Sequence, residues 1–525
     1  MKRTVAGRQV SVAAVLVTAS LVTAACAGSS TPVTVTNPKA AKPLASGSWP
    51  YPNGDLADTR DAAGSTITSA NVSGLTQAWT FHITGPAAAG IGPIGALSAN
   101  PVVVNGVVYI QDLDANVYAL ALATGELRWE YQLNTPMKTG PGPDGVAVAG
   151  GTVYGISPTT AFALNARTGK KIWVDSHLLG NGQGTFEIQP QVADGRVYLA
   201  SAYGSGPGGG VLLALNAATG EPLWRFNTVL GHDSGVEAIG LGAGGAWETP
   251  LVGSDGSVTF GIGNPYQSAA SAIAHPSAQL YTDSDVNVDA ATGKLRWYYQ
   301  GVPNDFKDYD MQASPISASV NGVPVVLGGG KMGYVYEMNA RTGKLIWKTP
   351  VGGHNGHDND SVLALEHKIT LKAPFTILPG SIGGILTDMA VAGTSIYVVT
   401  VDLPLIYTNL ELPVPVKSAG PATGEVEALS LATGKVEWDT KVPQMPLGAA
   451  TVSNDLIFTT LYDGVLIALD RSTGAIVFRR QLPTSSNSPI AVAGNTVIVP
   501  VGGPTVSKAG GGGNPQVVAF TVPVN

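Results

Sequence analysis

The strongest constraint on the fold is a short sequence pattern that recurs seven times along the chain. Each copy consists of alternating apolar residues, a Thr-Gly pair and an aromatic residue four positions after the glycine. So many copies are not expected by chance, and they indicate a repeat architecture. The aromatic residues of the seven copies are Trp129, Trp173, Trp224, Trp297, Trp347, Trp438 and Phe478.

The pattern predicts two strands joined by a tight turn. The apolar alternation has the two-residue period of a strand, and the glycine can adopt the positive φ that the turn requires. In "GELRW", Leu127 and Trp129 fall on the same face, so the indole ring is placed to pack on a neighbouring sheet. Most copies follow another hairpin, often with an Asn-Gly turn. Each repeat should therefore form a small antiparallel sheet that must stack on other sheets to bury both faces.

The repeat length and the two ends of the chain indicate how these sheets close. Most of the aromatic residues lie 40 to 51 positions apart, which suits one four-stranded sheet per repeat. After Phe478 the sequence contains three more strands, and "NVSGLTQAWTF", with Trp79, offers a fourth near the start. We therefore predict an all-β fold, an eight-bladed β-propeller closed by N- and C-terminal strands in one blade. The alternative is an open β-solenoid, whose terminal repeats would be exposed edges.

Two of the gaps between repeats are longer than the others, one after Trp224 and one after Trp347. Insertions of this kind are expected in loops at one rim of a propeller, where functional residues usually lie. The stretch "NDFKDYD" comes shortly after Trp297, the aromatic residue of the repeat that follows the first long gap. In an extended strand its Asp308 and Asp310 carboxylates would point the same way.

The N-terminus is typical of an export signal. A basic stretch precedes an apolar run of small residues that is short for a membrane span, so residues 1–25 are expected to be removed. The run ends in "TAAC", which resembles a bacterial lipobox and implies acylation of Cys26. Residues 26–47 have the composition of a flexible linker, and residues 48–525 form the predicted propeller. We expect an exported protein of the bacterial cell envelope, anchored to the membrane by a lipid on Cys26. The alternative is a plain secreted protein.

The net charge argues against nucleic-acid binding, and the cysteine content excludes an internal disulfide. The formal charge is −7, and the first 25 residues contain three basic and no acidic side chains, so the remainder carries −10. Such a chain is unsuited to binding the phosphate backbone of nucleic acid through bulk charge. Cys26 is the single cysteine, so no internal disulfide can form.

Several ordered motifs give the chain a family resemblance. These are "GGAW", "GNP", "TGKLRWYYQ", "NDFKDYD" and "GGGKMGYVYEMNARTG", together with the repeated Thr-Gly and tryptophan pattern. From about residue 48 onward the chain resembles the quinoprotein alcohol dehydrogenases, which depend on pyrroloquinoline quinone (PQQ). The resemblance implies a PQQ cofactor and a calcium or lanthanide ion. It also implies a small alcohol or sugar substrate, and a separate electron acceptor because no C-x-x-C-H haem motif is present.

The resemblance assigns roles to five residues of this chain. Trp247 would be the flat aromatic surface on which the quinone stacks. Asn264 would supply an amide oxygen to the metal ion. Asp308 matches a metal ligand that is also the base toward the alcohol, and Asp310 matches the extra carboxylate that accompanies lanthanide use. Lys331 would place positive charge near the quinone carbonyls, both binding the cofactor and assisting catalysis.

The chain departs from the family pattern at several places. The loop "ASAYGSGPGGGVLLAL" has no glutamate for the metal, and the segment "GPGPDGVAVAGG" lacks a common arginine. The cysteine pair that often covers the quinone cannot exist. Lys307 adjoins Asp308 and could pair with it instead of leaving it free as a base.

Other interpretations stay open at this level. Taken singly, Trp247 is typical of a core residue, and Asp308 and Asp310 are typical of a solvated loop. His354 and His357 could converge on a metal ion and support a hydrolase or lyase. The main alternative function is a non-catalytic propeller scaffold that binds a protein or another component of the cell envelope.

Overall fold

The computed structural model describes residues 47–85, 96–136, 142–204, 209–230, 243–412, 417–502 and 515–523. Cys26, the predicted signal segment and almost all of the predicted linker lie outside these residues. Within them, no helix has both the length and the apolar character needed to cross a membrane.

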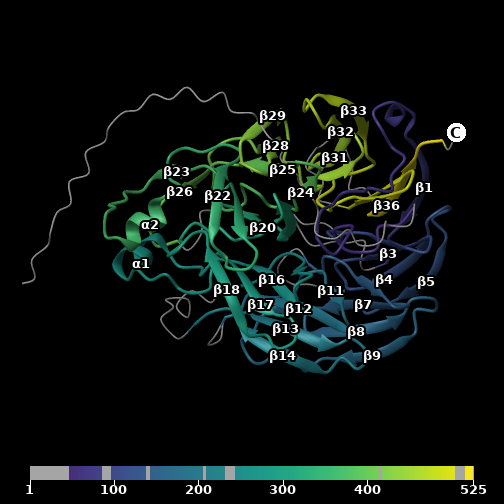
Figure 1. The fold of residues 1–525 in the computed structure, drawn as a ribbon, viewed down its shortest axis with the longest axis horizontal. Coiled ribbons are helices and arrows are strands. Elements are labelled where there is room, and N and C mark those ends of the chain that lie inside the picture. The colour runs from purple at the N-terminus through teal and green to yellow at the C-terminus, as the bar shows by residue number, and fades with distance from the viewer. Residues whose placement is uncertain are drawn as a thin grey trace, which may run out of the picture. The chain divides into compact units, whose positions relative to one another are not determined.

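The described residues form four-stranded antiparallel sheets in which consecutive strands pair in chain order, as predicted for the repeats (Figure 1). Four such sheets come from the first half of the chain. Their strands are β2 (Val102–Val104), β3 (Val107–Gln111), β4 (Val117–Ala121) and β5 (Leu127–Tyr131); β6 (Ala147–Ala149), β7 (Thr152–Ser157), β8 (Thr160–Asn165) and β9 (Lys171–Asp175); β11 (Gln191–Ala193), β12 (Arg196–Ala202), β13 (Val211–Asn216) and β14 (Pro222–Asn227), with β10 (Thr185–Phe186) added to β12; and β15 (Leu251–Val252), β16 (Ser257–Ile262), β17 (Ser284–Asp289) and β18 (Leu295–Gln300).

Three more sheets come from the second half. Their strands are β19 (Ile316–Val320), β20 (Val323–Gly330), β21 (Tyr334–Asn339) and β22 (Leu345–Pro350); β24 (Ala390–Ala392), β25 (Ser395–Asp402), β28 (Thr423–Ser430) and β29 (Val436–Val442); and β30 (Thr451–Ser453), β31 (Leu456–Leu461), β32 (Val465–Asp470) and β33 (Ile476–Gln481).

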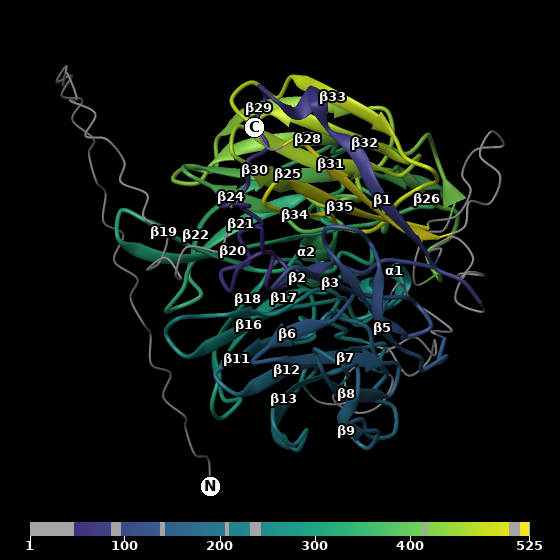
Figure 2. The same ribbon diagram turned by 90° about the vertical axis from the view of Figure 1, so that its right-hand side faces the viewer.

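A last sheet joins the two ends of the described chain. Strand β1 (Thr76–His82), which follows a short 3-10 helix at Val72–Gly74, pairs with β36 (Gln516–Thr521), and the sheet continues through β35 (Thr496–Val501) to β34 (Ala491–Ala493). Figure 2 shows the purple strand β1 beside the yellow C-terminal strands. This pairing confirms the predicted composite sheet and disagrees with an open solenoid. The predicted number of eight blades stays a prediction.

Neighbouring sheets dock through their tryptophans. The indole Nε1 of Trp129 donates to the carbonyl of Ala166 at 2.9 Å, and its ring lies so close to Gly169 that a Cβ there would be 2.7 Å away. Trp79 makes the same contact with Gly125, although its own strand lacks the Thr-Gly turn. The predicted packing of these rings on the next sheet is confirmed. Each ring packs against the glycine of the Thr-Gly turn in that sheet.

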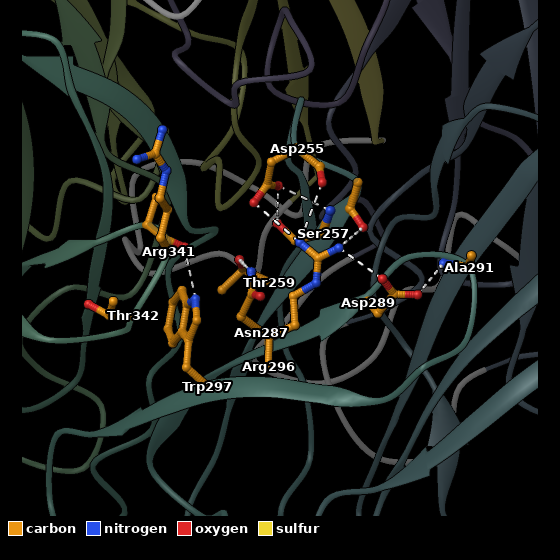
Figure 3. Close-up of polar contacts among 12 residues, drawn as sticks. Asp255, Ser257, Thr259, Asn287, Asp289, Ala291, Arg296, Trp297, Arg341 and Thr342 are labelled. Atoms are coloured by element: carbon orange, nitrogen blue, oxygen red, sulfur yellow. Dashed lines mark hydrogen bonds and ion pairs between the residues drawn. The ribbon is translucent and has the colours of Figure 1, made fainter.

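A polar network fixes the turn between β17 and β18 (Figure 3). The Asp289 carboxylate accepts hydrogen bonds from the Thr292 backbone at 3.0 Å and from the Arg296 guanidinium at 2.8 Å. The bonds from Arg296 and Thr292 lower the pKa of Asp289 to about 2. Arg296 also pairs with Asp255 on the neighbouring hairpin at 3.2 Å. The following residue, Trp297, points away from this network toward the next Thr-Gly turn.

The apolar core lies between adjacent sheets. One cluster joins Tyr109 and Val117 of the first sheet to Val153 and Phe162 of the second, all buried. The outermost strands, such as β5, are largely exposed. This distribution follows from the strand pattern, because inner strands are apolar on both faces and must be covered by sheets on both sides.

The segment of residues 49–67 crosses several sheets and is held by Arg60. Its guanidinium is fully buried and donates to the carbonyls of Ala450 (2.9 Å) and Ile490 (2.7 Å) and to the side chains of Asn53 (2.7 Å) and Thr451 (2.8 Å). Sequence reasoning gave no role to this arginine. It ties the N-terminal segment to strands that are far apart in the sequence.

The two long insertions meet on one side of the fold (Figure 1). The first supplies helix α1 (Ala269–Ala274), and the second supplies helix α2 (Asp360–Leu365) and a small sheet of β23 (Phe375–Ile377), β26 (Leu405–Tyr407) and β27 (Lys417–Ser418). They share one apolar cluster, which includes Ala269, Ala364, Tyr407 and Phe306. The insertions therefore pack around the "NDFKDYD" segment.

Candidate functional site

The "NDFKDYD" segment is an irregular loop held in place by buried hydrogen bonds. The Asp305 carboxylate accepts from the backbone N–H groups of Lys307 (3.0 Å) and Tyr309 (2.9 Å). The Tyr309 hydroxyl donates to the carbonyl of Pro379 at 2.6 Å, and the Tyr407 hydroxyl donates to that of Phe306. The second insertion thus fixes the path of the loop.

Asp308 and Asp310 meet at one amine, but not for the reason predicted. The segment is not an extended strand, and Asp308 has a left-handed φ of 64°. Both carboxylates nevertheless pair with Lys331, whose Nζ lies 3.1 Å from Asp308 Oδ2 and 2.5 Å from Asp310 Oδ2. They are buried, with exposed fractions of 7% and 0%, so the interpretation as a solvated loop is wrong.

The glycine run before Lys331 brings this lysine to the loop. Gly330 ends β20, and a Cβ on it would lie 1.9 Å from the Asp310 carbonyl oxygen. Only a residue without a side chain permits this close approach. The Lys331 backbone N–H then donates to the Asp310 carbonyl at 3.0 Å. Lys331 is buried, with an exposed fraction of 8%.

Asn264 and Trp247 complete the cluster. The Asn264 side-chain amide donates to Asp308 Oδ1 at 2.5 Å, and its backbone N–H donates to Asp310 Oδ1 at 2.7 Å. Lys331 Nζ lies over the Trp247 ring, 6.0 Å from its centroid. The structure therefore brings together all five residues that the resemblance selects. We call Trp247, Asn264, Asp308, Asp310 and Lys331 the Trp247 site; their chemical roles stay predictions.

Four further residues lie near the Trp247 site and were missed by sequence reasoning. Tyr203 packs edge-on against Trp247 with ring centroids 4.9 Å apart. Burial is the largest cause that raises the pKa of its hydroxyl. Electrostatic interactions with Glu187, Asp310, Asp308 and Asp144 raise this pKa further. Burial likewise raises the pKa of Tyr266, with smaller contributions from Asp308, Asp310, Tyr203 and Glu187. The signal for Tyr203 and Asp144 was their position, since each lies in a segment where the family pattern expects another residue.

Burial sets the electrostatics of this region. It raises the pKa of Asp144 to about 8 and that of Glu187 well above the usual range. It also raises the pKa of Asp308, and the Lys331 charge opposes that rise. Burial alone would lower the pKa of Lys331, but the charges of Asp308 and Asp310 raise it. Lys331 is therefore paired with two carboxylates, and burial favours the protonated form of the neighbouring Asp144 and Glu187.

Two predictions about residues close to the site in the sequence, the Lys307–Asp308 pair and a metal site at His354 and His357, are wrong. Lys307 does not pair with Asp308: it is fully buried, donates to the His357 carbonyl and lies 4.0 Å from Asp360. His354 and His357 do not converge on a shared site. The Nδ1 of His354 contacts Asp358 at 2.6 Å, whereas that of His357 contacts Asp360 at 2.8 Å, so each ring is held by its own carboxylate.

The residues present fit a metal ion poorly. Calcium takes six to eight oxygen ligands. Each oxygen of Asp308 and Asp310 already has a partner in Lys331 or Asn264. Within the described Trp247 site, Asn264 Oδ1 and Asp310 Oδ2 are buried without a hydrogen-bond partner, and the ion pair with Lys331 occupies Asp310 Oδ2. Asn264 Oδ1 is therefore the oxygen of the site that stays without a partner. The loop that should bring a glutamate brings Tyr203.

The residues present also do not fit the quinone. PQQ carries three carboxylates, and buried anions need cations or donors to replace water. In the part of the chain that the structure describes, the cation against Trp247 is Lys331, and two carboxylates already share it. Asp144 lies in the segment where the resemblance implies an arginine, and it is buried. A tricarboxylate would therefore find no uncommitted cation against Trp247 among the described residues.

Comparison with known proteins defines the relationship. A family model described as the β-propeller domain of glucose, ethanol and alcohol dehydrogenases matches residues 49–148 and 242–351. A second, described as the outer membrane protein assembly factor BamB, matches residues 137–240 and 422–519.

Individual relatives point the same way. The chain is 28% identical to the quinohemoprotein alcohol dehydrogenase of Comamonas testosteroni over 59% of this chain and 48% of that protein. It is 27% identical to the quinoprotein alcohol dehydrogenase PedH of Pseudomonas putida over 53% and 50%. It thus spans about half the length of these relatives.

A solved structure supports the fold. The quinohemoprotein alcohol dehydrogenase ADHIIG of Pseudomonas putida superposes with a TM-score of 0.77 at 20% identity, over 91% of this chain and 80% of that chain. This likeness confirms the predicted propeller fold. The chain therefore contains PQQ-type β-propeller segments and is homologous to the quinoprotein alcohol dehydrogenases over the matched residues.

Proposed function

We propose that this chain is a non-catalytic propeller that binds a protein or another component of the cell envelope, and that its Trp247 site no longer holds a quinone. The observation that carries the proposal is that the cation of that site is already neutralised. Lys331 is shared by two carboxylates, and the neighbouring buried acids Asp144 and Glu187 supply no positive charge. The match of two segments to the model of an outer membrane assembly factor supports a binding role.

A PQQ-dependent dehydrogenase of alcohols or sugars is the second candidate. It is favoured by the convergence of Trp247, Asn264, Asp308 and Lys331, which are distant in the sequence and adjacent in the fold. In that case PQQ with calcium or a lanthanide would occupy the site, and a separate acceptor would take the electrons. The names of the relatives support this class of protein, not this activity.

One experiment separates the two candidates. The purified chain is titrated with PQQ in the presence of calcium or lanthanum, and dye reduction is followed with a panel of alcohols and aldoses. We expect no quinone binding at micromolar concentration and no dye reduction. Binding with turnover would overturn the proposal and favour the dehydrogenase. Asp308→Asn should then abolish turnover and leave the quinone bound.

We also propose that the protein is exported and anchored to the bacterial membrane by a lipid on Cys26. The sequence "TAAC" after a basic and then apolar stretch supports this localisation. In a host that processes bacterial lipoproteins, the wild-type chain should partition with detergent and Cys26→Ser with the aqueous phase. Equal partitioning of both would favour a plain secreted protein.

A further inference from the structure

We propose that Lys331 is a built-in cation that takes the place of a metal ion, so that the Trp247 site is closed and independent of metal. The inference rests on the proposed function of the Trp247 site, but its test measures metal binding and uses neither quinone nor substrate. It concerns the two carboxylates Asp308 and Asp310 and what holds them together inside the protein.

All four carboxylate oxygens are committed to groups of the chain. Lys331 Nζ takes one oxygen of each residue, at 3.1 Å from Asp308 Oδ2 and 2.5 Å from Asp310 Oδ2. Asn264 takes the other two, through its side-chain amide at 2.5 Å and its backbone N–H at 2.7 Å. An ammonium carries three donors and no acceptor, so it can bridge two carboxylates as a small cation does.

The bridge is rigid because its backbone is fixed. Lys331 follows β20 directly, and its backbone N–H is bonded to the Asp310 carbonyl. Gly330 packs so closely on that carbonyl that a Cβ there would lie 1.9 Å from its oxygen, so the strand lies directly against the loop. A metal ion would have to displace the amine from both carboxylates and turn the Asn264 amide around. Buried charges that lose their partners are strongly unfavourable, so the exchange is opposed.

The carboxyl groups around the site are consistent with Lys331 as the internal counter-charge of Asp308 and Asp310. Asp305 and Asp283 also lie within electrostatic reach of Asp308. With Lys331 present, the two nearest carboxylates have one internal counter-charge. Without Lys331, Asp308, Asp310 and the Asn264 oxygen would form the oxygen-rich set that hard cations bind. Removing the lysine should therefore create a metal site.

Terbium luminescence tests this inference on the full chain. Terbium is a hard, oxygen-seeking ion, and nearby Trp247 can sensitise its emission. The wild type should show no saturable sensitised emission that depends on Asp310. Lys331→Met should bind terbium at least tenfold more tightly, and adding Asp310→Asn should remove that gain. Lys348→Met is the matched control, because it removes a positive charge from an exposed lysine on β22 of the same sheet.

Thermal unfolding with and without terbium is the second measurement, since Lys331→Met is expected to lower stability. Terbium should raise its midpoint and leave that of the wild type unchanged; rescue of a poorly folded variant by terbium also supports the inference. Asp310-dependent terbium binding by the wild type would overturn it. So would a Lys331→Met protein with neither emission nor a midpoint shift. Quinone binding without metal would overturn the proposed function alone, leaving this inference intact.

Discussion

Gly343→Ala tests whether tryptophan docking joins the sheets. Gly343 lies in the turn between β21 and β22 and has a φ of 66°. A Cβ at this position would lie 2.6 Å from Cε3 of Trp297, which belongs to β18 of the preceding sheet. The Trp297 indole also donates to the Ala340 carbonyl of the same turn at 2.9 Å. An alanine must therefore push the ring away from its turn.

The cost has three parts. A left-handed backbone costs alanine about 1 kcal/mol. Overpacking against the ring adds about 1–3 kcal/mol, and loss of the indole hydrogen bond adds about 1 kcal/mol. We therefore expect Gly343→Ala to lower the free energy of unfolding by about 3–5 kcal/mol. Gly322→Ala in the same sheet is the control: its φ is 78° and a Cβ there would meet nothing within 4 Å, so it should cost about 1 kcal/mol.

Urea unfolding of the full chain, followed by far-ultraviolet circular dichroism, measures both variants. Equal losses for Gly343→Ala and Gly322→Ala would refute the argument, because only the backbone term would remain. A double-mutant cycle sharpens the test. In a Trp297→Leu background, the excess cost of Gly343→Ala should largely disappear.

Two further predictions concern buried charges. Glu337 is 1% exposed and burial raises its pKa to about 7, so the folded chain keeps this proton to higher pH than the unfolded chain does. The free energy of unfolding should therefore fall by up to about 3 kcal/mol as pH rises from about 4.5 to about 7. Glu337→Gln should lack this part of the pH dependence in unfolding curves measured across the same range. The same pH dependence in both proteins would contradict the assignment. Arg60→Met should cost about 3–5 kcal/mol in the same denaturation assay, since it removes the buried bonds to Ala450, Thr451 and Ile490; a loss below about 1 kcal/mol would show that the N-terminal segment is held by its other contacts.

Much of the fold could be predicted because the repeat is local. An alternating strand, a glycine turn and an aromatic residue specify a hairpin within about fifteen residues, and each copy does so independently. The composite sheet of β1 with β36 was also predictable, because three strands at the end of the chain lacked a fourth. The partner of each indole was not, since the receiving carbonyl belongs to the next repeat, as with Trp129 and Ala166.

The candidate site was predictable only as a set of residues. The order of the motifs selected Trp247, Asn264, Asp308, Asp310 and Lys331, and the fold brings them together. The departure from the family pattern marked the loop that contains Tyr203, but its contact with Trp247 was not predictable, because that contact depends on a loop from another sheet.

By itself, the sequence determined which segments become strands, where they turn and how often the unit repeats, because those choices depend on neighbours a few positions away. Only the tertiary structure decided which lysine neutralises Asp308. Lys307 is adjacent in the chain, but the left-handed turn at Asp308 and the bonds of Asp305 direct it toward Asp360. Lys331 is far away in the chain but follows a strand whose glycines allow close approach. Charge pairing inside a protein is set by distance in space and by burial, and neither is fixed until the sheets have packed.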